Sequence, residues 1–346
     1  MKILMIGGDK NVLNLATPTG KRIEEYRQAL GELEVLVASG GIFSFISTLF
    51  RGWKMLRRRQ FDAITAQSPE HWFLAWIFSR ITKTPWQAQV HTDIFSSYFW
   101  KESLKNKIRV LLAKWLLPGA DKIRVVSERI KNSLVSNVRC QMSDVNVLPI
   151  FVDVEAIKNA PIKTDLHKKY PNNDFIILMA SRLTKEKNID LAIKAMKEVI
   201  KTHPKTLLLI VGAGPEFNKL NVKCQMLNVA SNVIFESWTK DLASYYKTAD
   251  LFLLTSNYEG YGRTIVEAAA GGLSAIMTDV GLAGEFLKNS VNGLIIPINN
   301  KNELINAIDD MIKNKDKLKE FSKNTEKTVR QLTTKEEYFK KYEEIL

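Results

Sequence analysis

Short apolar runs alternate with longer amphipathic stretches along the first 150 residues of the chain. The apolar runs fit buried parallel strands and occupy residues 2–8, 34–39, 61–67, 86–92, 122–127 and 145–150. The amphipathic stretches between them have a helical period and occupy residues 20–31, 45–60, 71–82, 104–117 and 128–136. This alternation predicts a doubly wound α/β sheet.

The alternation stops at residues 151–173, which contain two prolines and no steady period and therefore predict a linker. It then resumes with apolar runs at residues 175–181, 206–214, 232–237, 250–256, 274–279 and 292–297. The helical stretches that follow these runs occupy residues 188–203, 215–227, 242–249, 262–272, 282–289 and 301–314. The last stretch, residues 335–346, is a charged helix that could close the chain onto either half.

The pattern therefore predicts two Rossmann-like halves of similar size. We place the first domain at residues 1–155 and the second at 156–333, with a terminal helix at 334–346 packing back on the first. Ligands bind such sheets beyond the carboxyl ends of the strands, so two sheets facing across a cleft could hold two substrates. This architecture favours group transfer over simple binding.

The positive charge of the chain is unevenly distributed. Hydrophobic residues make up 45% of the 346 residues, which indicates a globular protein, and the formal net charge is +13. Residues 1–150 contain 22 Lys and Arg against 12 Asp and Glu, so most of the excess lies in the first half. Such an excess suits a phosphate-rich partner: a nucleotide, a nucleic acid or an anionic membrane.

Cysteine usage and hydropathy restrict the compartment. Cys140 and Cys224 lie far apart in sequence, which argues against a disulfide framework and against a zinc site. No apolar run reaches the roughly 18 residues of a membrane span, and the N-terminal run is too short for a signal peptide. We therefore expect a cytoplasmic protein that is soluble or peripheral on the inner face of the cytoplasmic membrane.

Basic side chains follow the first strand of the second half, in MASRLTKEKNID at residues 179–190. Arg182 and Lys187 lie just past that strand, at the end where ligands bind. A planar guanidinium and an ammonium there suit a diphosphate, and the alternative is a solvated loop. Further along, VGAGP at residues 211–215 lacks the third glycine of a dinucleotide fingerprint and fits a tight strand-to-helix turn.

Two glutamates stand eight positions apart in NYEGYGRTIVEAAAGG, at residues 257–272. Glu259 follows a buried strand in a glycine-rich turn, and Glu267 lies on the helix that begins after Gly262. The backbone N–H groups that open this helix can hold a phosphate, and each carboxylate can accept hydrogen bonds from vicinal hydroxyls. This set fits a sugar nucleotide; the alternative makes Glu259 a turn residue and Glu267 a solvated helix position.

These motifs resemble those of the GT-B-fold retaining glycosyltransferases of family 4, also called glycosyl transferases group 1. That family has E-G-F-G-x-x-x-x-E-A, and this chain has EGYGRTIVEA. The family's G-R-x-x-x-x-K-G corresponds to SRLTKEKN, with Ser181 and Asn188 in the glycine positions, and its V-G-x-G-P corresponds to VGAGP. Weaker likenesses in the first half are VVSERIKNSL and LPIFVDVEAI. The resemblance covers nearly the whole chain and is more specific in the second half.

The resemblance implies a role for each charged residue of these motifs. Arg182 and Lys187 would neutralise the donor diphosphate and the leaving nucleoside diphosphate. Glu267 would accept hydrogen bonds from the ribose, and Glu259 would hold hydroxyls of the donor sugar. These four residues form the predicted centre of the site.

The resemblance also implies contacts from backbone and from the first half. His91, at the end of a first-half strand, would lie near the reacting centre, although a lone histidine is more often structural. Gly20 would belong to a loop that approaches the donor phosphates. Backbone N–H groups would contact phosphate or sugar at Gly262, Arg263, Thr264 and Ile265.

The implied reaction transfers a sugar from a nucleoside-diphosphate sugar of the UDP or GDP type to a hydroxyl, with retention at the anomeric carbon. Arg182, Lys187 and helix N-termini would stabilise the leaving diphosphate. No Asp-x-Asp cluster follows a strand, so we expect no metal and no other cofactor. Glu259 could act as a nucleophile, as in retaining hydrolases, but the family implies a front-face route in which a diphosphate oxygen takes the acceptor proton.

The acceptor is expected on the basic first half. Residues 45–60 and 104–117 are amphipathic, basic and contain Trp, so they could lie on an anionic membrane and present a glycan or lipid-linked acceptor. For each segment alone, a core-facing helix with a solvated basic side explains the pattern better. The two together, with the charge imbalance, favour membrane contact.

The chain departs from the family pattern at two further positions, and two other classes of protein share some of its features. Leu273 and Leu282 stand where the family often has Pro and Gly, which bears on donor choice more than on reaction class. A nucleotide-sugar epimerase shares the fold but needs no acceptor. A nucleic-acid-binding protein would explain the charge but not the glutamates after a strand, and it would need exposed aromatics among its Lys and Arg, so we expect no nucleic-acid partner.

Overall fold

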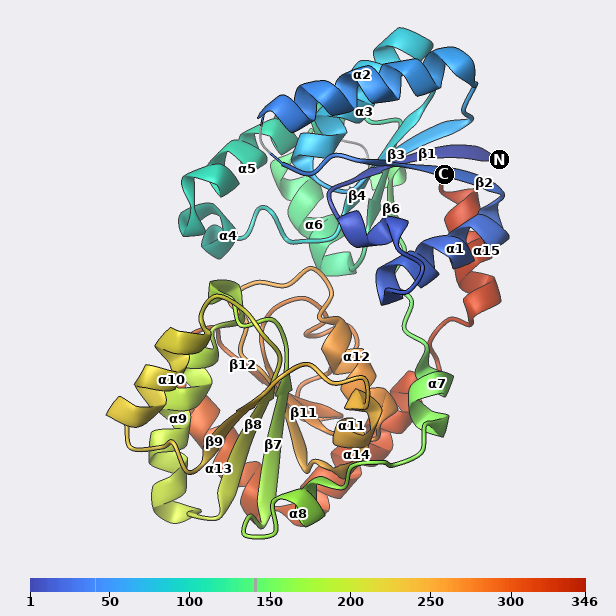
Figure 1. The fold of residues 1–346 in the computed structure, drawn as a ribbon. Helices are drawn as coiled ribbons and strands as arrows, with labels where there is room; N and C mark the ends of the chain where they lie inside the picture. Colours follow the sequence, from blue (N-terminus) through green and yellow to red (C-terminus); the bar gives the residue numbers. More distant parts are fainter. Residues whose placement is uncertain (41, 140–141) are drawn as a thin grey trace. The chain divides into compact units, whose positions relative to one another are not determined.

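The computed structural model describes residues 1–40, 42–139 and 142–346. These residues form two compact units, Met1–Phe151 with Thr333–Leu346, and Val152–Leu332. The chain leaves the first unit slightly before the expected boundary at residue 155 and returns to it at Thr333. The terminal helix α15 (Lys335–Glu344) therefore belongs to the first unit (Figure 1).

The first unit contains a six-stranded sheet with the strand order β2-β1-β3-β4-β5-β6. Its strand pairs are all parallel, as the buried apolar runs predict. The strands are β1 (Lys2–Gly7), β2 (Glu32–Val37), β3 (Ala63–Ala66), β4 (Trp86–Val90), β5 (Lys122–Val125) and β6 (Val145–Val147).

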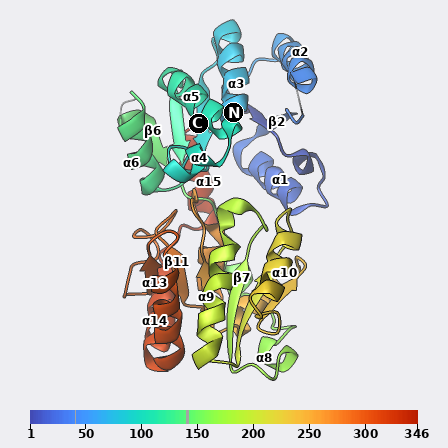
Figure 2. The same cartoon turned by 90° about the vertical axis from the view of Figure 1, so that its left-hand side faces the viewer.

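Helices cover both faces of this sheet. Helix α3 lies between α2 and α5, and α1 packs against α15 (Figures 1 and 2). Hydroxyl side chains cap several of these helices; Thr17, Ser103 and Ser127, for example, each accept a hydrogen bond from a backbone N–H of the first turn. The helices are α1 (Pro18–Leu30), α2 (Ile42–Arg58), α3 (Pro69–Thr82), α4 (Ser97–Glu102), α5 (Leu104–Leu116) and α6 (Glu128–Asn137).

A buried polar network fixes α15 to the first sheet. Arg124 of β5 is 2% exposed, donates to Tyr338 Oη at 2.9 Å and lies 4.8 Å from the ring centroid of Tyr342. The Gln89 amide donates to Tyr342 Oη at 2.6 Å. The two hydroxyls of Tyr26 and Tyr338 lie 2.6 Å apart. Because a buried guanidinium needs acceptors in place of water, these tyrosines make α15 part of the core of the first unit.

The second unit contains another six-stranded parallel sheet, with the order β12-β11-β10-β7-β8-β9. Its strands are β7 (Phe175–Ala180), β8 (Thr206–Val211), β9 (Val233–Glu236), β10 (Leu251–Leu254), β11 (Ala275–Thr278) and β12 (Gly293–Ile296). Its helices are α7 (Val154–Asn159), α8 (Leu166–Lys169), α9 (Ile189–Thr202), α10 (Phe217–Met226), α11 (Leu242–Thr248), α12 (Arg263–Ala270), α13 (Lys301–Lys313) and α14 (Lys315–Val329).

The apolar strands of the second unit are buried on both faces of the sheet. In β7, Phe175, Ile177 and Met179 alternate along one face and pack in a core cluster with side chains of α9 and α13. The intervening Ile176 and Leu178 are fully buried on the other face. This two-sided burial explains the continuous apolar runs in the sequence, and all twelve predicted strands are confirmed.

Some predicted elements are wrong. Residues 282–289 were expected to form a helix, but they form turns. Gly281 and Gly284 adopt left-handed backbone conformations with φ of 52° and 83°, which no α-helix accommodates. Leu282 and Phe286 are buried, but the backbone around them forms turns and not a helix with one apolar face. The expected linker contains the short helices α7 and α8, and α4 and α14 were not predicted.

The structure also bears on the cysteines and on membrane spans. Cys224 is buried in α10, and burial raises the pKa of its thiol to about 11. Cys140 lies outside the described residues.

Over residues 1–40, 42–139 and 142–346, no helix combines the length and the apolar content that crossing a bilayer requires.

Candidate active site

The two central strands of the second sheet bring the sequence motifs together. Strands β7 and β10 are adjacent and parallel, with Ile177 opposite Leu251. Their carboxyl ends therefore lie at the same edge of the sheet, and the loops at residues 181–188 and 255–262 meet there. The first loop carries Arg182 and Lys187, and the second carries Glu259.

Lys187 and Glu259 form an ion pair at this edge. The Nζ atom of Lys187 lies 2.5 Å from Glu259 Oε1, and the two side chains are 17% and 12% exposed. Ser256 Oγ donates to the same carboxylate oxygen at 2.8 Å. Because the pair is largely withdrawn from water, its charges act on a ligand more strongly than exposed charges would. The carboxylate can still accept from sugar hydroxyls, and the ammonium has three hydrogens to donate.

Backbone and amide hydrogen bonds hold the two loops in register. Thr255 Oγ1 donates to the carbonyl oxygens of Lys187 and Asn188, each at 3.0 Å. The Asn257 N–H donates to the Glu186 carbonyl at 2.7 Å. The Asn188 amide donates to Asn257 Oδ1 at 3.0 Å. The ion pair therefore rests on a scaffold that ties its two loops together.

Asn188 replaces a glycine of the family motif and has a left-handed backbone with φ of 46°. Asparagine tolerates this conformation better than most residues. Its amide also donates to Asn299 Oδ1 at 2.5 Å, which adds a third loop to the scaffold. The departure from glycine therefore preserves the backbone conformation and adds two hydrogen bonds.

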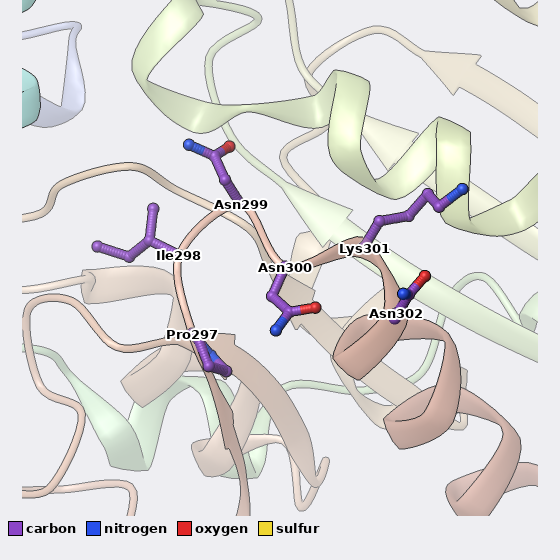
Figure 3. Close-up of a pocket in the computed structure, with 6 residues that line it drawn as sticks. All are labelled: Pro297, Ile298, Asn299, Asn300, Lys301 and Asn302. Carbon is purple, nitrogen blue, oxygen red and sulfur yellow. The ribbon is translucent and has the colours of Figure 1, made fainter.

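That third loop, residues 297–300 after β12, lines a hollow of about 610 Å³ together with Lys301 and Asn302 at the start of α13 (Figure 3). Figure 3 shows the amide side chains of Asn299 and Asn300 projecting in different directions from the turn. Asn300 caps α13 by accepting from the Glu303 N–H at 3.1 Å. The hollow is therefore lined mainly by polar groups next to the loop of Lys187.

Arg182 lies apart from the ion pair. Its side chain is 78% exposed and contacts Glu186 at 3.4 Å. Its loop is held by the glycines of VGAGP: a Cβ on Gly212 would lie 1.9 Å from the Ser181 carbonyl oxygen, and one on Gly214 would lie 2.4 Å from that of Leu183. These glycines therefore permit close packing of the loop, and the exposed guanidinium can reach an anionic ligand.

Helix α12 begins at the end of the glutamate turn. Gly262 is its N-cap residue, with φ of 84° and no side-chain cap. The Ile265 N–H donates to the Gly262 carbonyl at 2.9 Å, and the Ile265 side chain is 1% exposed. Ile265 is therefore part of the core, with its N–H engaged inside the turn. Arg263 and Thr264 lie in the first turn of the helix, where an anion would be favoured.

Glu267 has its own partners on the same helix and on α11. Arg263 Nε lies 2.6 Å from Glu267 Oε1, and the Tyr246 hydroxyl donates to Oε2 at 3.0 Å. The Glu267 side chain is 12% exposed, while Tyr246 is 2% exposed. Burial and the adjacent carboxylate raise the pKa of Tyr246, so its hydroxyl remains a donor. The two glutamates thus belong to separate polar clusters of one unit.

Tyr246 and Ser256 contact the predicted glutamates but were not predicted from the sequence. Tyr246 lies in LASYYKTA, where an aromatic residue on a helix resembles any other core residue. Ser256 precedes Glu259 by three residues, a spacing typical of side-chain hydrogen bonds within turns. That spacing was the one available signal for either residue.

Two predicted residues lie in the first unit. His91 directly follows β4 and keeps some exposed surface, but its Nε2 atom is out of solvent and has no hydrogen-bond partner among the described residues. Burial, with Arg124 and Arg22 nearby, lowers the pKa of His91 to about 3, so the ring is neutral at neutral pH. Its role near the reacting centre stays a prediction.

Gly20 lies in the first turn of α1. A Cβ there would fall 2.0 Å from the Asn14 carbonyl oxygen, so the preceding loop requires glycine at this position. The Gly20 N–H donates to Thr17 Oγ1 at 3.0 Å. This packing alone accounts for the glycine, and its approach to donor phosphates stays a prediction.

Metal ligands were not expected. Within the part of the chain that the structure describes, no group of three or more His, Cys, Asp and Glu side chains is placed to hold a metal ion.

Two family models match consecutive parts of the chain. The model of Glycosyltransferase Family 4 matches residues 13–156, and that of Glycosyl transferases group 1 matches residues 163–328. With the two parallel α/β sheets, these matches define the class: the chain belongs to the GT-B-fold glycosyltransferases of the family 4 group. The expected family, fold class and enzyme class are confirmed.

Curated relatives of this chain are glycosyltransferases. The UDP-Gal:alpha-D-GlcNAc-diphosphoundecaprenol alpha-1,3-galactosyltransferase of Escherichia coli is 28% identical over 76% of this chain and 69% of its own length. The alpha-monoglucosyldiacylglycerol synthase of Streptococcus pneumoniae is 28% identical over 58% of this chain and 47% of its own length. The putative glycosyltransferase YtcC of Bacillus subtilis is 27% identical, and the match spans 62% of that protein.

Solved structures share the fold over almost the entire chain. Anabaena Alr3699/HepE in complex with UDP-glucose superposes with a TM-score of 0.78 at 20% identity, covering 99% of this chain and 97% of that one. Sucrose-phosphate synthase from Thermosynechococcus elongatus superposes with a TM-score of 0.81 at 18% identity, covering 99% and 98%. At these identities the likeness establishes the fold.

Proposed function

We propose that this glycosyltransferase transfers a sugar from a nucleoside-diphosphate sugar of the UDP or GDP type to a hydroxyl of a glycan or lipid-linked acceptor, with retention at the anomeric carbon. The reaction would serve glycan, glycolipid or cell-surface polysaccharide synthesis at the inner face of the cytoplasmic membrane. The UDP and UDP-glucose complexes of Anabaena Alr3699/HepE and the named reactions of the relatives support this donor and acceptor class.

The observation that carries the proposal is the Lys187–Glu259 pair at the carboxyl ends of β7 and β10. A cation and a carboxylate in contact can bind a ligand that has both phosphates and hydroxyls. Glu267 lies in α12, eight residues after Glu259, and is oriented by Tyr246 and Arg263, which suits it to ribose hydroxyls. A binding module for phosphate alone would need neither glutamate.

In the proposed reaction, the bond between the anomeric carbon and the diphosphate oxygen breaks, and the electron pair leaves with the diphosphate. Lys187 and Arg182 stabilise the charge that develops on this leaving group. The acceptor hydroxyl forms the new bond on the same face of the sugar, and its proton passes to a diphosphate oxygen. Glu259 holds sugar hydroxyls and orients the anomeric carbon.

The reaction as proposed needs no metal, because lysine and arginine supply the positive charge that a divalent cation supplies elsewhere. Chelation is therefore expected to leave activity unchanged. Loss of activity in EDTA that is restored by Mg²⁺ or Mn²⁺ would contradict this part of the proposal and leave the donor assignment intact.

The donor site is tested by thermal unfolding of the purified chain with UDP, GDP, ADP and their sugar conjugates. A ligand that binds the folded state raises the melting temperature by mass action. We expect one nucleoside diphosphate to shift the wild type, and Glu267→Ala to abolish the shift. Glu320→Ala, which changes an exposed glutamate of α14, is the matched control.

Retention is tested by the anomeric configuration of the product, read from its proton NMR coupling constants. Release of nucleoside diphosphate that depends on an added glycolipid acceptor supports transfer. An epimerised free sugar nucleotide formed without acceptor would assign the chain to an epimerase reaction.

In the thermal unfolding experiment, a melting temperature that no nucleotide shifts would contradict the proposed donor site.

A further inference from the structure

Helix α5 of the first unit presents its apolar stripe to solvent. Four large apolar side chains recur along it at the spacing of one helix face and are between 53% and 74% exposed: Leu104, Ile108, Leu111 and Trp115. The face that packs on the unit carries Asn106, Val110 and Ala113, which are nearly fully buried. For this segment taken alone, the sequence favoured burial of the apolar stripe, and that interpretation is wrong for α5; the two segments together favoured membrane contact.

Helix α2 exposes a second stripe with the same spacing. Ile46, Phe50 and Trp53 are 46%, 64% and 43% exposed. Gly52 lets α2 approach α3, because a Cβ there would fall 2.3 Å from the Phe78 ring. Beside this contact, a groove of about 230 Å³ is lined only by apolar residues: Leu49, Phe50, Trp53, Ile77, Phe78 and Ile81.

The two stripes belong to one surface, because aromatic rings connect them across α3. Phe73 of α3 stacks on Phe45 of α2 at 6.0 Å between ring centroids and on Trp76 at 5.9 Å. Trp115 of α5 lies 5.2 Å from Trp76. Figures 1 and 2 show α3 between the two other helices. We call the exposed apolar residues of α2, α3 and α5, with the basic residues beside them, the amphipathic face.

Basic side chains border the apolar stripes. Helices α2 and α5 together contain eight Lys and Arg and no Asp or Glu. The Arg57 guanidinium lies 4.8 Å from the centroid of the Trp53 ring. By helical spacing, Lys107 and Lys114 flank one side of the α5 stripe and Lys105 the other. Their long stems can follow apolar surface while their charges reach an anionic layer.

The combination of exposed apolar stripes and basic side chains indicates which kind of partner covers the amphipathic face. Glu70 of α3 pairs with Arg109 and Lys105, but a second copy of the chain would still bring the other six basic residues of α2 and α5 against the same six, which opposes self-association. A nucleic acid would neutralise the charges but would leave Leu104, Ile108 and Leu111 in water. An anionic bilayer satisfies both features, since its phosphates lie directly above an apolar layer.

We propose that the amphipathic face docks on an anionic phospholipid bilayer. Leu111, Trp115 and Phe50 enter the boundary between headgroups and acyl chains, while Lys107, Lys114 and Arg57 contact lipid phosphates. The helices lie in the plane of the bilayer surface. This proposal specifies the membrane contact of the proposed function and gives the first unit direct access to a lipid-linked acceptor.

Co-sedimentation of the full chain with large unilamellar vesicles tests the proposal. Vesicles contain phosphatidylglycerol and phosphatidylcholine, or phosphatidylcholine alone, at roughly 0.1 M salt. The test variants are Ile108→Ser with Leu111→Ser, and Lys107→Glu with Lys114→Glu. The matched controls make the same changes at exposed positions of the second unit, Val222→Ser with Met226→Ser on α10, and Lys319→Glu with Lys323→Glu on α14.

We expect the wild type and both controls to bind the anionic vesicles, and each test variant to bind them at least about tenfold more weakly. Circular dichroism shows whether each variant is folded. Equal binding to neutral and anionic vesicles, or retained binding by either test variant, would overturn the proposal. Wild-type dimers that Ile108→Ser with Leu111→Ser dissociates would instead assign the face to a protein interface. The assay uses no sugar donor, so its failure is separate from failure of the proposed reaction.

Discussion

Single side chains of the second unit account for most of the proposed chemistry. Glu259 contacts Lys187 and Ser256, and Glu267 contacts Arg263 and Tyr246. Each glutamate therefore has a cation and a hydroxyl group beside it. These contacts hold each carboxylate in one orientation before substrate arrives, which lowers the entropy cost of binding. The two glutamates proposed to hold the donor and the side chains that position them therefore lie within hydrogen-bonding distance.

Replacement of Lys187 by alanine is expected to reduce kcat/KM about 100-fold or more, because it removes charge stabilisation of the leaving group. Steady-state kinetics and nucleotide-dependent thermal shifts measure the loss. Lys185→Ala removes an exposed lysine from the same loop and should leave both measurements near wild type. Equal effects of the two substitutions would show that catalysis and nucleotide binding depend only on the overall charge of the loop.

His91 is expected to make stability depend on pH. Its pKa is about 3 in the folded chain and near 6.5 when unfolded, so below pH 6.5 the unfolded state binds the extra proton. Stability is therefore lost as the pH falls from about 6.5 towards 3, by about 1 kcal/mol at pH 5.5. Urea unfolding at pH 8 and pH 5.5 measures this loss.

The comparison variant is His91→Gln, which cannot titrate in this range. Its free energy of unfolding should change less than that of the wild type between the two pH values. If both proteins lose the same stability, the histidine ring is protonated or solvated in the folded state, and its assigned environment is wrong.

At the level of elements, the fold follows local sequence except where long-range partners intervene. The twelve strands appear where the apolar runs predict them, because strands buried on both faces need continuous apolar sequence. The segment at residues 282–289 looked helical but is a pair of turns set by Gly281 and Gly284. The charged segment of α15 could have closed onto either half by its sequence, and burial of its Tyr338 and Tyr342 on Arg124 fixes it to the first unit.

The anchoring of α15 predicts a specific stability effect. Tyr342→Ala should lower the free energy of unfolding by about 3–5 kcal/mol, because it removes a buried ring from the core. Tyr342→Phe should cost about 1–3 kcal/mol, since the buried Gln89 amide loses one of its two acceptors and keeps only Thr65 Oγ1. Lys340→Ala, at an exposed position of the same helix, should change stability little. A small effect of Tyr342→Ala would show that α15 is not part of the core.

At the scale of the whole molecule, the chain consists of two units with separate sheets and separate cores. The first carries the amphipathic face, and the second carries Glu259 and Glu267 with their partners. The two proposals thus place donor binding and acceptor delivery in different units. Each can be altered by substitutions that do not touch the other.

This division predicts where a nucleotide protects the chain. Hydrogen exchange with saturating UDP or GDP should slow most at residues 181–188 and 255–267 of the second unit. The same experiment on Lys187→Ala should show weaker protection at both segments. Protection confined to the first unit would place the nucleotide elsewhere and contradict the assignment of the donor site.

The sequence by itself determined the alternation of strands and helices, the two halves and the glutamate motif. These features depend on the periodicity of neighbouring residues and on turn chemistry, which are local. Tertiary structure decided the contact of Lys187 with Glu259, the hydroxyl of Tyr246 on Glu267, and the attachment of α15 to the first unit. It also decided that the apolar stripe of α5 faces solvent. An amphipathic pattern shows that one face is apolar, but only the packing of distant segments determines whether another element covers it.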